Sequence, residues 1–406
     1  MKFNKWTLGL AAVGAVSLTS VAQAEEKMML GSQAATGLTS TTISGYVDTS
    51  AHWNIGKDNV GAPTGAAKQD GFNLNVVQVS LSKALDESEW ASGYRADLWF
   101  GPDANSLGSQ SSGPVVTSPG TVTGLGALSG TTTSGGSDFA IRQAYVALRT
   151  PVGNGIDWKM GVFDTIVGYE TLESGNNPNY TRSLGFGLEP TTHTGLLGTY
   201  RFCDSVSASA GVVNSFGPAV NGRNTANESR KTYMGSVALT APSDWGWVAG
   251  SSLYLGAISG FDSASPGTDG SRDHYYAGLT LATPVSGMKV GAAFDYSHAN
   301  HIQNANVDNT YVYGLYASFQ ATEKLSLHGR AEYQRTQDAG GAAGQPADRS
   351  EATLTAQYDL WKNVISRVEL RWDHSEANAF QVNGNGSATS LDKNTYLAAL
   401  NVIYKF

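Results

Sequence analysis

The sequence predicts an all-β fold: a transmembrane antiparallel β-barrel of about 16 strands, with short periplasmic turns and long external loops. Three observations predict it. Apolar and polar residues alternate along many short segments, no segment after residue 24 is a long apolar run, and an alternating strand closes the chain at Phe406. A membrane barrel needs no long apolar run, because its lipid-facing residues occupy every second position of each strand.

The first 24 residues predict a cleaved secretory signal peptide. Lys2 and Lys5 precede an apolar run at 6–18, and small residues at 22–24 precede the expected cleavage site before Glu25. A basic start, a short apolar core and a small-residue exit are the layout of such a signal. A retained membrane anchor is the alternative, but about a dozen apolar residues are too few to span a bilayer as a helix.

Three segments follow from this interpretation. Residues 1–24 are the signal peptide, residues 25–40 are expected to form an N-terminal periplasmic lead-in, and residues 41–406 are expected to form the barrel. An exported barrel of this kind belongs in the outer membrane of the cell.

The composition favours a barrel and excludes several other classes. Charged residues make up 15% of the chain, against roughly 25% in ordinary soluble domains. Without the two lysines of the signal, 24 basic residues remain against 34 acidic ones, a net charge of −10. Nucleic acid is therefore not an expected partner, since phosphate binding needs clustered Lys and Arg. The single cysteine, Cys203, can form neither an internal disulfide nor a cysteine-based zinc cluster.

The alternation indicates the strands in chain order. It is clearest at 364–373, where Arg367 and Glu369 share one face with further charged residues, while Val368 and Leu370 lie on the other face. Successive strand side chains point to opposite sides of a sheet. The 16 strands are expected to begin near residues 42, 72, 90, 139, 156, 192, 206, 230, 246, 273, 288, 310, 325, 350, 364 and 394.

Short and long connections alternate strictly between these strands. The short turns lie near 86–88, 151–155, 203–205, 242–244, 284–287, 321–324 and 360–363. The long loops, rich in Gly, Ser, Asn and Thr, lie at about 55–70, 102–138, 171–190, 215–228, 260–271, 300–308, 337–349 and 375–391. Outer-membrane barrels have short turns at one end and long loops at the other. We expect the low-complexity stretch 106–137 to be one flexible external loop, with a disordered segment of no role as the alternative.

Four segments together resemble one protein family. Residues 139–149 contain R-Q-A-Y, 160–170 contain G-V-F-D-T-I-V-G-Y-E, 176–183 end in N-P-N-Y-T-R-S, and 190–195 read P-T-T-H-T-G. This pattern is similar to the β-barrel porin family of OmpL-like outer-membrane porins, and it covers about a seventh of the chain. The resemblance implies a general or weakly selective channel, without implying a particular solute.

Inward-facing charges are the expected determinants of selectivity, because a barrel of about 16 strands leaves an aqueous channel. The pore-lining candidates are Arg95, Asp97, Lys289, Asp295, Arg330, Glu332, Arg367, Glu369, Arg371 and Asp373. Basic and acidic residues alternate along single strands, which predicts a transverse field and a wide specificity for small polar solutes. Rings of a single sign produce strong ion selection instead. The alternative is that these residues form structural ion pairs only.

The loop at 171–190 is the expected constriction. It is the third long loop, and in general porins the third external loop folds into the barrel. A loop inside a channel must satisfy its backbone polar groups with the wall or with water, and this loop is dense in hydrogen-bonding side chains. The constriction candidates are Glu170, Glu173, Asn177, Asn179, Tyr180, Arg182 and Glu189. An ordinary external loop is the alternative.

The expected function is an outer-membrane porin that forms a water-filled channel for passive diffusion of small hydrophilic solutes and ions. No cofactor, metal site or catalytic residue is expected, since the sequence has neither an H-E-x-x-H nor a G-x-S-x-G motif. The alternatives are a structural or adhesive barrel with binding loops and, less favoured, a barrel-embedded hydrolase that uses His193 or His328. The expected partners are outer-membrane lipid, small polar solutes and, by analogy with general porins, two further copies in a homotrimer.

Overall fold

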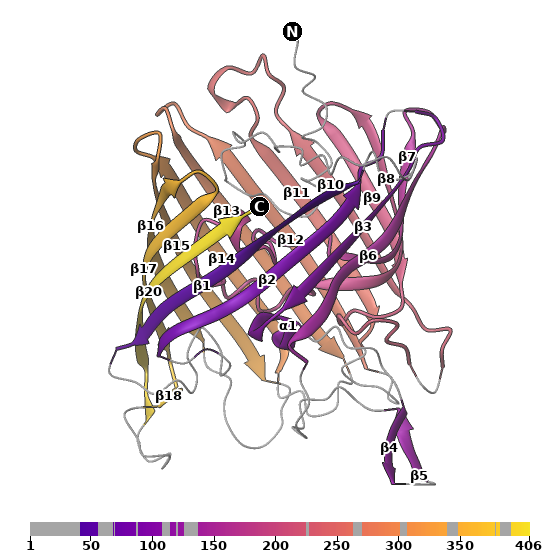
Figure 1. Ribbon diagram of the computed structural model, residues 1–406, viewed down its shortest axis with the longest axis horizontal. Coiled ribbons are helices and arrows are strands. Elements are labelled where there is room, and N and C mark those ends of the chain that lie inside the picture. Colours follow the sequence, from indigo (N-terminus) through magenta and orange to yellow (C-terminus); the bar gives the residue numbers. More distant parts are fainter. Residues whose placement is uncertain are drawn as a thin grey trace, which may run out of the picture.

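The computed structural model describes residues 41–55, 68, 70–86, 88–107, 114–118, 121–125, 137–224, 227–262, 270–300, 307–338, 348–377, 379–381 and 391–406. Sixteen antiparallel strands form a closed barrel (Figure 1), and the last strand pairs with the first. The predicted fold class is confirmed. The predicted signal peptide and the lead-in at 25–40 lie outside the described residues.

The barrel strands follow one another around the ring in chain order. They are β1 (Thr42–Asn54), β2 (Gly71–Lys83), β3 (Ser92–Phe100), β6 (Phe139–Thr150), β7 (Ile156–Asp164), β8 (Thr192–Cys203), β9 (Val206–Val213), β10 (Thr232–Thr240), β11 (Ser252–Phe261), β12 (Ser271–Ala282), β13 (Met288–Asn300), β14 (Val307–Gln320), β15 (Leu325–Asp338), β16 (Arg349–Trp361), β17 (Val364–Ser375) and β20 (Asn394–Lys405). The remaining elements are α1 (Pro102–Ser106), β4 (Pro114–Ser118), β5 (Thr121–Leu125), η1 (Ser174–Asn176), η2 (Gly246–Val248), β18 (Phe380–Gln381) and β19 (Leu391–Asp392).

The predicted start of the strand near residue 246 is wrong. Residues Gly246–Val248 form the short 3₁₀ helix η2, and β11 begins only at Ser252. Gly246 and Gly250 have φ angles of 61° and 77°, in the left-handed region that glycine adopts at little cost. The chain therefore turns before it enters the sheet, and this connection is longer than the predicted turn at 242–244.

The segment 106–137, expected to be one flexible loop, contains a two-stranded sheet of β4 and β5 among its described residues. It is preceded by α1, which follows Gly101 and has Pro102 in its first turn, where proline is favoured. Ala104 and Leu107 pack against Val76 and Trp99 in one buried cluster. Helix α1 and Leu107 therefore cover part of β2 and β3.

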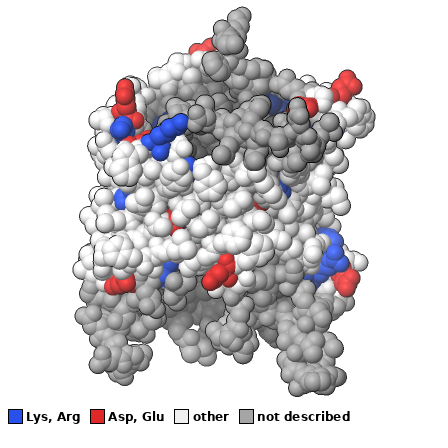
Figure 2. Space-filling view, viewed as in Figure 1, with Lys and Arg blue, Asp and Glu red and all other residues white. Residues whose placement is uncertain are grey.

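Alternating burial separates an apolar outer face from a polar inner face of the barrel. In β17, Val368 and Leu370 are 54% and 58% exposed, whereas Arg367, Glu369 and the other charged residues of the strand are buried. Figure 2 shows mostly uncharged atoms across the middle of the visible face, with Lys, Arg, Asp and Glu gathered toward its two ends. Such an apolar band is what a bilayer requires of a barrel. Among the described residues, no helix is long and apolar enough to cross a membrane.

Two β-bulges add polar side chains to the inner face. The register of β3 against β6 slips between Asp97 and Leu98, so that Arg142 has no partner of its own in β3. As a result Arg142 and Gln143, although consecutive, are both buried. A second slip, between β1 and β2, has the same effect at Asn75. A bulge disturbs strict alternation in this way, which parity along the sequence does not reveal.

Candidate functional site

The connection between β7 and β8, residues 165–191, lies inside the barrel, and we call it the inner loop. It begins earlier than the predicted loop at 171–190, because β7 already ends at Asp164. Its Tyr180 hydroxyl donates to Ser50 Oγ of β1 at 2.9 Å. Its Asn179 Nδ2 donates to Thr355 Oγ1 of β16 at 2.7 Å. Since β1 and β16 lie far from β7 around the ring, the inner loop crosses the interior.

The first arm of the inner loop packs on an apolar stretch of the inner wall. Ile166, Val167 and Tyr169 are buried in one cluster with residues of β8 to β14. The Tyr169 ring stacks on Tyr316 with centroids 3.8 Å apart, and a Cβ at Gly291 would lie only 1.9 Å from the Tyr169 hydroxyl oxygen. Burial of side chains of this size contributes about 1.5–3 kcal/mol each. This arm therefore holds the inner loop on one wall without charges.

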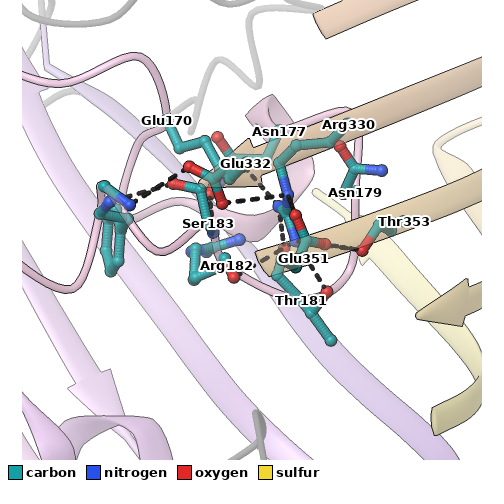
Figure 3. A network of polar contacts seen from close by, with 12 residues as sticks. Glu170, Asn177, Asn179, Thr181, Arg182, Ser183, Arg330, Glu332, Glu351 and Thr353 are labelled. Atoms are coloured by element: carbon teal, nitrogen blue, oxygen red, sulfur yellow. Dashed lines mark hydrogen bonds and ion pairs between the residues drawn. The ribbon is translucent and has the colours of Figure 1, made fainter. Parts of the chain in front are cut away.

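The adjoining strand β15 holds the inner loop through a buried guanidinium, that of Arg330, which pairs across the strands with Tyr316 (Figure 3). Arg330 Nη1 donates to Glu170 Oε1 at 2.6 Å and to the Thr181 carbonyl at 2.8 Å. Arg330 Nη2 donates to Glu351 Oε1 at 3.0 Å, and the Ser183 amide donates to the other oxygen of Glu170. The Arg330 side chain has no exposed surface. Its guanidinium group therefore binds the inner loop at two places, Glu170 and Thr181.

Two wall carboxylates bind backbone amides of the same loop. Glu369 of β17 accepts from the amides of Tyr180 and Thr181 at 2.6 and 2.9 Å. Glu332 of β15 accepts from the amides of Leu184 and Gly185 at 2.5 and 3.2 Å. Hydrogen bonds to a charged acceptor are roughly twice as strong as neutral ones. Two of the predicted pore-lining residues, Glu332 and Glu369, therefore act as acceptors for backbone amides.

Arg367 and Arg371 bind the carbonyl groups of the inner loop. Arg367 donates to the carbonyls of Ser174 and Asn177 at 3.1 and 2.5 Å. Arg371 donates to the carbonyl of Arg182 at 2.5 Å and also pairs with a carboxylate of its own strand. Both arginines are buried. They supply the hydrogen-bond partners that an irregular backbone inside a membrane barrel requires. We define the Arg330 cluster as Glu170, Arg330, Glu332, Glu351, Arg371 and Asp373.

A second ion cluster connects the inner loop to β3, β6 and β7. Arg142 pairs with Asp97 and Glu173 at 2.8 Å and with Asp164 at 2.5 Å. Arg95 pairs with Asp97 at 2.8 Å and with Glu173 at 3.0 Å. We define these five residues as the Arg142 cluster. Unlike the Arg330 cluster it is open to water, since the Arg95 and Asp164 side chains are 34% and 38% exposed.

Two carboxyl groups of the inner loop have opposite electrostatic surroundings. Burial alone raises the pKa of a carboxyl group, but the Arg142 and Arg95 guanidinium groups lower the pKa of Glu173 to about 2. Burial raises the pKa of Glu189 well above its usual range. The nearby carboxylates of Asp295, Glu170 and Glu332 raise it further. Glu173 is therefore a strongly held anion, whereas Glu189 favours its protonated form.

The remaining predicted residues have varied places. Asp295 is buried and pairs with His274 at 3.1 Å. Lys289 is exposed, at the short-turn end of β13. Asn177 connects two parts of the inner loop. Its side chain accepts a hydrogen bond from the Thr171 amide and donates one to the Thr171 carbonyl. The Arg182 guanidinium lies 5.3 Å from the Phe186 ring. Among the described residues no group of His, Cys, Asp and Glu side chains is arranged to hold a metal ion.

Three charged residues of the site are absent from the predicted set: Arg142, Asp164 and Glu351. Arg142 and Asp164 stand in the segments at 139–149 and 160–170 that carry the family resemblance. The family motif therefore indicates these two residues, whereas strand parity does not. Glu351 lies on the same face of β16 as Arg349, Thr353 and Thr355, and its ion pairs with Arg330 and Arg371 place it in the cluster.

Comparisons with known proteins agree on the architecture. The family model described as beta-barrel porin-2, OmpL-like, matches residues 40–406. Among solved structures, an anion-selective porin from Comamonas acidovorans is similar with a TM-score of 0.60 at 13% identity, over 90% of this chain and 99% of that chain. The trimer form of OmpT from Vibrio cholerae has a TM-score of 0.55 at 12% identity, over 90% and 99%. At such identities the structures show the fold alone. A search of curated proteins finds no significant match.

Proposed function

The chain belongs to the beta-barrel porin-2, OmpL-like family, and on that premise we propose that it is a water-filled outer-membrane channel for passive diffusion of small hydrophilic solutes and ions. The proposal is supported mainly by the exposure of two charged side chains. Beside the inner loop, Arg95 and Asp164 keep 34% and 38% of their side chains exposed inside the barrel. Water therefore reaches charged groups at the level where the loop narrows the interior.

The same arrangement supports the inner loop as the constriction. It is held to the walls of β1 and β13 to β17 by the contacts described above, and it leaves the Arg142 cluster facing the remaining space. Opposite charges lie side by side in that cluster. Neighbouring charges of opposite sign orient dipolar solutes and select weakly between ions, unlike rings of one sign. Small polar solutes of either charge are the proposed substrates.

A channel without catalysis is the reading that the polar contacts favour over a hydrolase. Ser318 Oγ lies 2.7 Å from His328 Nδ1, but His328 Nε2 has no hydrogen-bond partner among the described residues. His193 contacts the Ser215 carbonyl and the Thr165 hydroxyl. Nucleophilic catalysis by a serine needs a histidine that a third, usually acidic, group orients, and in the part of the chain that the structure describes neither histidine has that partner.

We also propose that the protein assembles as a homotrimer. The solved OmpT of Vibrio cholerae with the same fold includes a trimer form, and a ring of three copies is one of the closed symmetries that homo-oligomers adopt. Sedimentation or native mass measurement in mild detergent should give three barrels. A single-barrel mass under conditions that keep the protein folded would contradict the assembly and leave the channel proposal untouched.

Planar-bilayer recording of the purified mature protein tests the channel proposal. We expect discrete conductance steps that grow with salt concentration, and swelling of protein-containing liposomes in small sugars but not in large ones. Heat-unfolded protein in the same vesicles is the matched control. Folded, outer-membrane-extracted protein that neither conducts nor admits sugars would refute the proposal and favour a structural or adhesive barrel.

A further inference from the structure

Lys159 of β7 is a lumen-facing cation outside the ion pairs described so far. Its neighbour Met160 is 68% exposed on the outer face, so Lys159 points inward. Its ammonium group lies 5.0 Å from the centroid of the Tyr145 ring, and no hydrogen bond or ion pair joins it to another residue in the described part of the chain. The side chain is only half-buried. A lysine placed this way keeps its charge available to the lumen.

The strand register places Lys159 next to the Arg142 cluster. Tyr145 of β6 pairs with Arg95 on one side and with Gly161 on the other. Lys159 is two residues before Gly161, which is one inward position, or about 7 Å, toward the short-turn end. An ion that passes the exposed side chains of Arg95 and Asp164 therefore passes Lys159 at the adjoining level.

The net charge of the Arg142 cluster explains why a cation at Lys159 matters. The Arg142 cluster contains two arginines against the three carboxylates of Asp97, Asp164 and Glu173. Its formal charge is −1, so the cluster alone would repel anions. Lys159 brings the group to zero. The Arg330 cluster does not enter this balance, because its guanidinium groups are buried and bound to the inner loop.

We propose that Lys159 sets the ion preference of the channel: its free ammonium group cancels the excess negative charge of the Arg142 cluster and admits small anions, such as chloride and short carboxylates. The inference rests on the proposed channel function. It names a specificity-determining residue on a wall from which the sequence pattern had singled out only Arg95 and Asp97.

Reversal potentials in a KCl gradient test the inference, with folding of each variant checked by its heat-dependent migration on gels. Lys159→Gln should raise the cation-to-anion permeability ratio roughly threefold at low salt, where screening is weak. Lys159→Arg, which keeps the charge, should match the native protein. Lys289→Gln is the matched control, because it removes the same charge from the exposed end of β13, away from the cluster, and it should produce less than half the shift.

A compensating second substitution distinguishes an electrostatic effect of Lys159 on passing ions from a structural effect of replacing it. In the double variant Lys159→Gln with Asp164→Asn, the ratio should return to near the native value, and Asp164→Asn alone should shift it toward anions. An unchanged ratio in Lys159→Gln, an equal shift in Lys289→Gln, or no recovery in the double variant would each overturn the assignment while conductance persists. Absence of conductance in the native protein would instead refute the proposed function, and this inference with it.

Discussion

The two ion clusters inside the barrel are built from the same residue types but differ in exposure. In the Arg330 cluster, Arg330, Glu170 and Glu351 have no exposed side-chain surface. In the Arg142 cluster, Arg95 and Asp164 are each about one-third exposed. A charge buried among its partners is expensive to uncover, whereas one in contact with water adds to the field that a passing ion meets. Burial, not residue type, therefore separates anchoring charges from lumen charges.

The largest expected effect is on stability, and it distinguishes the two clusters. Arg330→Met leaves Glu170 buried without its cation and leaves Glu351 with only the Arg371 guanidinium at 3.8 Å, which should cost about 3–5 kcal/mol. Arg95→Met removes a partly hydrated pair and should cost about 1 kcal/mol or less. Unfolding in denaturant, followed by tryptophan fluorescence in lipid vesicles, measures both. Equal losses would show that the exposure difference does not control the energetics.

A second experiment removes the arginines that bind loop carbonyls. Replacing Arg367 and Arg371 together by Gln should loosen the inner loop, because the carbonyls of Ser174, Asn177 and Arg182 lose charged donors worth about 1.5–3 kcal/mol each. We expect noisier single-channel currents with little change of ion preference, because both guanidinium groups are buried and bound to the loop. Native current noise would show that these arginines do not hold the loop.

The smallest expected effect is a pH dependence at Glu173. Its folded pKa of about 2 lies below the ordinary value of about 4.3, so its pairing stabilises the loop above about pH 4. That stabilisation, at most about 3 kcal/mol, is lost as the pH falls from about 4 to 2. Native channels should become noisier in this interval.

The matched variant Glu173→Gln should already be noisy at pH 7 and should change little on acidification. Asn177→Asp is unsuitable as a control because it alters the loop itself. Glu323→Gln, in an exposed short turn, leaves the inner loop intact and should keep the native pH response. Identical pH profiles for the native protein and Glu173→Gln would exclude Glu173 as the source.

Strand alternation predicted most of the fold, because it directly reports which side chains face lipid. It placed β17 correctly, with Arg367 and Glu369 on the inner face and Val368 and Leu370 outside. It failed where the backbone leaves strict pairing: at Gly246 and Gly250, which delay β11, and at the bulge that turns Arg142 inward.

The candidate site was harder to predict than the fold. The sequence singled out a loop that the structure places inside the barrel, with several of its residues, but their partners are largely backbone groups, such as the amides that Glu369 binds and the carbonyls that Arg367 binds. Any residue supplies such groups, so no residue pattern marks them. Exposure inside the barrel depends on how the inner loop lies, and for this reason Asp164 and Lys159 were not singled out.

Single-channel conductance with and without the middle of the inner loop shows whether the barrel is an open channel that residues 165–191 narrow. Deleting residues 174–183 removes the segment bound by Arg367 and Glu369, while β7 and β8 remain intact. If the account is right, the native protein conducts in discrete steps and the deletion variant, still a folded barrel, conducts in larger ones. Equal conductance in both proteins, or none in the native protein, would contradict it.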